Sequence, residues 1–95
     1  MKTLEACRAE IDAIDAQLVR LFEQRMRVSR SVAAYKQAHR MDILDASREQ
    51  AVLDSRAALI TEEALRQPAR EFFTALMRLS REEQARFLAG GESDR

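Results

Sequence analysis

Three cationic side chains lie on or beside the apolar face of one long predicted helix at the N-terminus. Arg25 occupies a heptad position where the pattern otherwise places small or apolar residues, and Arg8 and Lys36 each directly follow an apolar position. Placing a guanidinium on an apolar face costs several kcal/mol unless an anion meets it. The stripe itself carries no acid, and Asp15 is the only acid on the flank that holds Arg8 and Lys36. We therefore predict that the missing anion is a ligand.

More polar residues are out of place later in the chain, at the start of a second predicted helix and on the apolar stripe of a third: Asp45, Arg48, Glu49, Ser80 and Gln84. Spacing decides which cations act together. Arg25 and Lys36 are about 16 Å apart along a helix, so a small ligand fits between their long side chains. Arg8 is about 25 Å from Arg25 on the same rod. In an antiparallel dimer, Arg8 of one chain would reach the Arg25 region of the other.

The cations of the first helix are carried by a heptad pattern from about Thr3 to Gln37, with Thr3 as a plausible N-cap and no Gly or Pro inside. Its two seam positions hold Leu4, Ile11, Leu18, Arg25 and Val32, and Cys7, Ile14, Leu21, Val28 and Tyr35. Such a helix is roughly 50 Å long, and the remaining residues cannot readily cover it within one compact globule. We expect an obligate homodimer that shares its long helices.

Two shorter helices should follow, which makes the fold all-α with three helices in one domain over residues 1–95. The second should start near Asp45 or Ser47, where Ser47 and Gln50 fit a capping box, and end within 61–63. The third should begin near Pro68 and stop at Gly90-Gly91, before a frayed tail at about 90–95.

Composition excludes several other classes of protein. The 95 residues are 34% charged with a net charge of zero, which gives no indication of nucleic-acid binding. No segment approaches the roughly 20 apolar residues of a membrane span, and the N-terminus lacks the apolar stretch of a signal peptide, so we expect a soluble cytoplasmic protein. Cys7 on the seam is expected to be a small core residue, and His39 an exposed loop residue.

The order and spacing of these residues closely resemble the all-helical chorismate mutase family. The resemblance covers about residues 4–88. The matching segments are Arg8-x-x-Ile11-Asp12-x-Ile14-Asp15-x-x-Leu18, Leu21-x-x-x-Arg25-Met26-x-Val28, Val32-x-x-x-Lys36, Asp45-x-x-Arg48-Glu49 and Ser80-x-x-x-Gln84.

The resemblance implies an intertwined dimer with two equivalent sites that rearranges chorismate, a small dicarboxylate, to prephenate in aromatic amino-acid biosynthesis. The reaction is an intramolecular [3,3] shift with no covalent intermediate, metal or cofactor. By the same resemblance, Arg25 and Arg8 of the partner chain would bind the two carboxylates. Arg48 would order the site, and Ser80 would add a hydrogen bond.

The resemblance also assigns the four remaining polar residues. Lys36 and Gln84 would hold the ether oxygen of the breaking bond, where negative charge builds in the transition state. Asp45 and Glu49 would take the ring hydroxyl. Arg81 is a departure, because the family often has an aliphatic residue there. It either turns outward or adds a cation that alters substrate choice.

Other interpretations stay open at this point. Each residue alone has an ordinary explanation, such as an N-cap for Asp45, a solvated pair for Arg48 and Glu49, or polar seam positions for Ser80 and Gln84. Within the fold, isochorismate-pyruvate lyase and 4-amino-4-deoxychorismate mutase are alternatives. A non-catalytic helical dimer that regulates a larger enzyme is a third. Association with a shikimate-pathway enzyme is compatible with activity.

Overall fold

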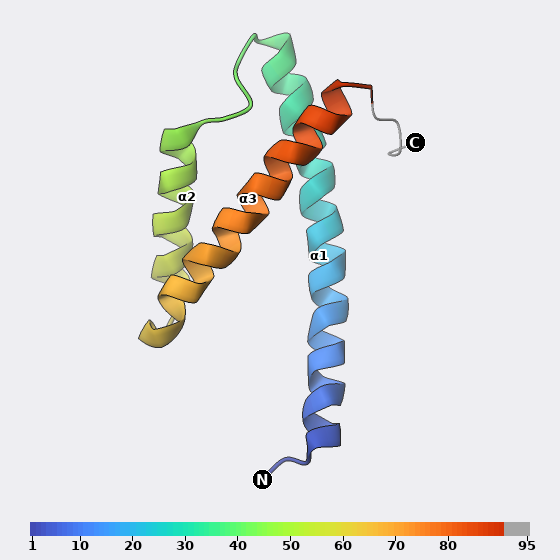
Figure 1. The fold of residues 1–95 in the computed structure, drawn as a ribbon, viewed down its shortest axis with the longest axis vertical. Coiled ribbons are helices and arrows are strands. Elements are labelled where there is room, and N and C mark those ends of the chain that lie inside the picture. Colours follow the sequence, from blue (N-terminus) through green and yellow to red (C-terminus); the bar gives the residue numbers. More distant parts are fainter. Residues whose placement is uncertain (91–95) are drawn as a thin grey trace.

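The chain folds into three α-helices and one short 3-10 helix. The computed structural model describes residues 1–90, with α1 at Leu4–Ala38, α2 at Ala46–Leu59, η1 at Glu63–Leu65 and α3 at Arg66–Leu88. Figure 1 shows α3 crossing from the far end of α2 to the C-terminal half of α1, while the N-terminal half of α1 extends away from both. Helix α3 packs on both of the others, whereas the α1 and α2 backbones make no close approach. The predicted all-α, three-helix fold is confirmed.

Local signals fix most of the helix ends. Thr3 caps α1 as predicted, because its Oγ1 accepts a hydrogen bond from the Ala6 amide at 3.0 Å. Arg40, with a φ of 55°, turns the chain out of α1. Gly90 ends α3 with a φ of 93°, a conformation that favours glycine. The rest of the predicted frayed tail lies outside the described residues.

Of the two residues expected to cap α2, only Asp45 does so. Asp45 is the cap, and its Oδ1 accepts from the Arg48 amide at 3.0 Å. Ser47 lies inside the first turn and donates to Asp45, while Gln50 donates to Asp54, so the predicted Ser47–Gln50 capping box is wrong. An ionised carboxylate is a stronger acceptor than a hydroxyl, which favours Asp45 at this position.

The link between α2 and α3 is also shifted by a few residues. Helix α2 ends at Leu59, before the predicted 61–63, and η1 occupies part of the connection. Helix α3 begins at Arg66, so Pro68 lies in its first turn, where its missing amide hydrogen is tolerated.

The apolar heptad seam of α1 is not the surface that packs inside the chain. The buried residues of α1 are Met26, Ser29 and Ala33, whereas seam residues such as Ile11 and Leu21 are 54% and 60% exposed. The radius of gyration of 16.5 Å exceeds the roughly 12 Å expected of a compact domain of this length. One chain therefore leaves most of its longest apolar stripe uncovered. Within residues 1–90, every helix is too short or too polar to span a membrane.

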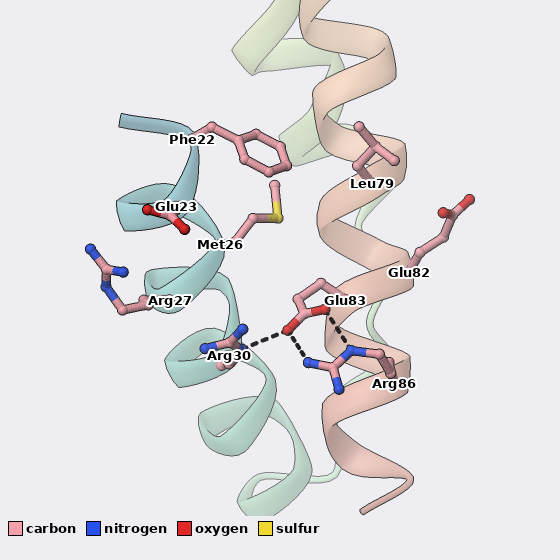
Figure 2. Close-up of a pocket in the computed structure, with 9 residues that line it drawn as sticks. All are labelled: Phe22, Glu23, Met26, Arg27, Arg30, Leu79, Glu82, Glu83 and Arg86. Carbon is pink, nitrogen blue, oxygen red and sulfur yellow. Dashed lines mark hydrogen bonds and ion pairs between the residues drawn. The ribbon is translucent and has the colours of Figure 1, made fainter. Parts of the chain in front are cut away.

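An ion-pair cluster ties α1 to α3 along one edge of their interface. Figure 2 shows the Glu83 carboxylate between Arg30 of α1 and Arg86 of α3, beside a cavity whose apolar wall includes Met26 and Leu79. Arg30 Nε donates to Glu83 at 2.6 Å, and Arg86 donates from Nε and Nη2 at 2.8 and 2.5 Å. The hydrogen bonds from Arg86 and then from Arg30 lower the pKa of Glu83 to about 2.

We expect Glu83→Gln to lower the free energy of unfolding at pH 7 by roughly 1 kcal/mol, because both arginines lose an anionic partner. The lowered pKa means that ionised Glu83 stabilises the fold above its ordinary value of 4.5, and that this contribution fades as the pH falls toward 2. Urea unfolding followed by circular dichroism, repeated at falling pH, should show the two proteins converging.

Glu82→Gln is the matched control, since Glu82 forms an exposed pair with Arg78. It should have little effect at any pH. A difference between wild type and Glu83→Gln that does not depend on pH would contradict the ion-pair assignment.

Candidate active site

One cavity gathers seven of the eight polar residues that the sequence singled out. It measures about 280 Å³, close to the lower end of the roughly 300–1,000 Å³ typical of small-molecule pockets. Helix α1 contributes Arg25 and Lys36. The start of α2 and the C-terminal half of α3 contribute Asp45, Arg48, Glu49, Ser80 and Gln84. All of these residues come from the C-terminal half of α1, from the start of α2 and from the C-terminal half of α3, and Figure 1 shows how these three helices are arranged.

Arg8 is the residue that the cavity does not include. It is exposed on the N-terminal half of α1, about 25 Å along the helix from Arg25. Because α1 is one continuous helix from Leu4 to Ala38, Arg8 cannot bend back to reach the cavity of its own chain.

Arg25 meets no carboxylate in the described part of the chain. Burial lowers its pKa from the usual value, and the nearby charges of Arg56 and Arg48 lower it further. Arg25, Lys36, Arg48, Arg56 and Arg81 line the cavity together with only two acids, Asp45 and Glu49. Positive charge therefore exceeds negative charge by three, and a small dianion would relieve the repulsion between the arginines.

Lys36 is positioned by the connection that follows α1. Its Nζ donates to the carbonyl oxygen of Ile43 at 2.7 Å, and its own carbonyl accepts from the Met41 amide at 2.8 Å. These two bonds fold the connection over the end of α1. An ammonium has three donors, so Lys36 retains hydrogen-bonding capacity for a ligand.

Both acids at the start of α2 already have partners. The Asp45 carboxylate accepts from the Arg48 amide and then from the Ser47 hydroxyl, and these bonds lower its pKa. Glu49 accepts from Arg81, which turns into the cavity rather than outward. A carboxylate has about four acceptor sites, so each acid can still accept a bond from a ligand hydroxyl.

A buried hydrogen-bonded chain links α1 to α3 at the floor of the cavity. The Ser29 and Ser80 hydroxyl oxygens are 2.6 Å apart, and Gln84 Nε2 donates to Ser80 Oγ at 3.2 Å. Gln84 Oε1 is buried and has no hydrogen-bond partner among residues 1–90. An unmet buried acceptor costs about 1–3 kcal/mol, which makes this amide a natural contact for a ligand.

The chain matches the family described as Chorismate mutase type II over residues 7–85. The match spans most of the sequence and includes the whole cavity. The protein belongs to the type II chorismate mutase family. No curated protein and no solved structure matches the chain.

Two polar cavity residues of this chorismate mutase family member, Ser29 and Arg56, were not anticipated from its sequence. Ser29 lies four residues after Arg25, and Arg56 lies seven residues after Glu49. These spacings put each on the same helical face as its neighbour, which is the signal that could have identified them. From the sequence alone, Ser29 is indistinguishable from a surface serine, and Arg56 is indistinguishable from an ordinary charged residue near a helix end.

We expect Ser29→Ala to lower the free energy of unfolding by about 1 kcal/mol, because the buried Ser80 hydroxyl loses one of its two partners. Urea unfolding would measure the change. Ser31→Ala, two residues later on the exposed side of α1, is the matched control and should be close to wild type. Equal stability of all three proteins would contradict a structural role for the Ser29–Ser80 bond.

Proposed function

We propose that this protein is a chorismate mutase that converts chorismate to prephenate in a pocket completed by a second copy of the chain. The observation that carries the proposal is the uncompensated positive charge in a small cavity of a type II family member. Neither Arg25 nor Arg48 forms a salt bridge with an acid among residues 1–90, and chorismate supplies two carboxylates. Guanidinium groups match carboxylates with two parallel hydrogen bonds.

The second copy supplies Arg8 in this proposal. The exposed seam of α1 supports such a dimer, because several large apolar residues of the seam are exposed in one chain: Leu4, Ile11, Ile14, Leu18, Leu21, Val28, Val32 and Tyr35. Contiguous apolar surface of this extent is uncommon on monomers. An antiparallel copy of α1 over the seam would bring its Arg8 toward Arg25 of the first chain.

Catalysis in this proposal has two physical sources. Cations at both ends of the substrate hold it in a compact chair, so that the bond-forming carbons meet without further ordering. Lys36 and Gln84 then donate to the ether oxygen, which gains negative charge as its bond breaks. Rotating the Gln84 amide would let its oxygen accept from Ser80 and turn its NH₂ group to the substrate. Because this amide is neutral, it donates without titrating.

Asp45 and Glu49 accept the ring hydroxyl in the same scheme, with Ser80 assisting at a carboxylate. No metal or other cofactor takes part. We place the reaction in the cytoplasm, in aromatic amino-acid biosynthesis. Association with another enzyme of the shikimate pathway is a further expectation.

The deciding experiment mixes the protein with chorismate, follows loss of the conjugated-diene absorbance and separates the products by chromatography. We expect prephenate without pyruvate. Isochorismate is run alongside, and pyruvate release at higher efficiency would move the assignment to the lyase of the same fold. Inactivity toward both substrates would contradict the proposed function and leave the aminodeoxy substrate or a binding role.

We expect Arg25→Ala to reduce kcat/KM for chorismate by at least ~100-fold, because the other cations cannot replace its two-pronged contact. The variant should keep its helicity and thermal stability, since it removes an unpaired charge. Arg20→Ala, at an exposed position of the same helix, is the matched control and should retain activity. Full activity of Arg25→Ala would overturn the assignment of the site.

A further inference from the structure

Arg81 forms an ion pair with Glu49 inside the candidate active site. Its Nη1 lies 2.5 Å from Oε1 and 2.6 Å from Oε2 of the Glu49 carboxylate. The two side chains are 33% and 24% exposed, and both line the cavity. The pair joins α2 to α3, and its acid, Glu49, is one of the two that accept the ring hydroxyl in the proposed function.

This pair changes the charge that a substrate ring meets. An unpaired Glu49 would present a full negative charge, which attracts a ring ammonium more strongly than a neutral hydroxyl. With Arg81 on its carboxylate, the charge of Glu49 is balanced locally. Its remaining lone pairs still accept a hydrogen bond from a hydroxyl.

The neighbouring cations also disfavour a ring ammonium relative to a neutral hydroxyl. Lys36 and Arg48 also line this part of the cavity, and Asp45, the other acid, is engaged at the helix cap. Within residues 1–90, a ring ammonium would therefore meet one carboxylate without an ion-pair partner, that of Asp45, among several cations. A neutral hydroxyl meets no such repulsion.

We propose that the Glu49–Arg81 pair makes this pocket selective for a dicarboxylate whose ring carries a neutral hydroxyl, against the analogue that carries an ammonium there. Arg81 is thus a specificity-determining residue that acts through Glu49. The inference rests on the proposed function, because it takes the ring substituent to lie at Glu49.

The test compares kcat/KM for chorismate and for 4-amino-4-deoxychorismate, whose amine is protonated at neutral pH. Wild type should prefer chorismate. Arg81→Met keeps an unbranched stem of similar length, removes the guanidinium and frees Glu49, so the amino-to-hydroxyl efficiency ratio should rise roughly ten-fold, as expected for one partly screened charge. Arg81→Lys keeps the charge and should leave the ratio within about three-fold of wild type.

Two further variants separate selectivity from folding. Arg78→Met removes an exposed arginine of α3 that pairs with Glu82, and it should leave the ratio unchanged. Glu49→Gln leaves Arg81 unpaired in the cavity, so the ratio should fall below that of wild type. Glu49→Gln therefore tests the proposal even where Arg81→Met fails to fold.

The outcomes distinguish this inference from the proposed function. The protein could convert chorismate while neither Arg81→Met nor Glu49→Gln changes the amino-to-hydroxyl efficiency ratio. That result would overturn the selectivity role, and the pair would then only stabilise the packing of α2 on α3. A wild type that prefers the amino substrate would overturn it as well. A wild type that converts neither substrate would contradict the proposed function itself, and the inference with it.

Discussion

The length of α1 is the constraint on which the rest of the structure depends. A helix of 35 residues is about 50 Å long, and the molecule measures 55 Å along its longest axis. Helix α2 and helix α3 have 14 and 23 residues, and Figure 1 shows α3 crossing the C-terminal half of α1 while α2 packs on α3. The N-terminal end of α1 extends away from both helices (Figure 1), whereas Leu18 lines a cavity with Phe72 and Phe73 of α3. The same geometry keeps Arg8 away from the cavity to which Arg25 contributes.

The cavity is built to hold charge that the chain itself does not neutralise. Most exposed charges of a protein cost little because water surrounds them, but Arg25 is half-buried and faces two other arginines. Glu83 shows the contrasting case on the other edge of the α1/α3 interface, where one carboxylate balances two arginines and ties the helices together (Figure 2). The cavity edge differs, because among its cations only Arg81 forms a salt bridge within residues 1–90, with Glu49. This difference supports the proposed binding site.

Much of the fold could be read from the sequence because local rules determine it. The Thr3 cap, the unbroken heptads of α1 and the position of Pro68 in the first turn of α3 each depend on a few neighbouring residues. The surface that α1 uses inside the chain was not predictable in the same way. The seam is the most apolar face, yet the residues that α1 buries inside the chain are Met26, Ser29 and Ala33, two of which have small side chains.

The site shows the same division between local and long-range information. Spacing on single helices grouped Arg25 with Lys36 and Ser80 with Gln84, and the cavity contains all four. The partners of Glu49 and Ser80 depend on how α2, α1 and α3 cross, so neither Arg81 on Glu49 nor Ser29 on Ser80 follows from spacing alone. Arg81 departs from the family pattern, but the sequence alone did not determine whether its side chain points outward or into the cavity.

In the proposed function each site is assembled from two copies of the chain, and one mixing experiment tests this shared site directly. Arg8→Ala and Arg25→Ala homodimers should each be inactive, because both of their sites lack one arginine. A heterodimer of the two variants has one site with both arginines, so an equal mixture should recover about a quarter of wild-type activity after random exchange. Recovery of that size would establish the shared site. No recovery, with heterodimers verified by native mass spectrometry, would contradict it.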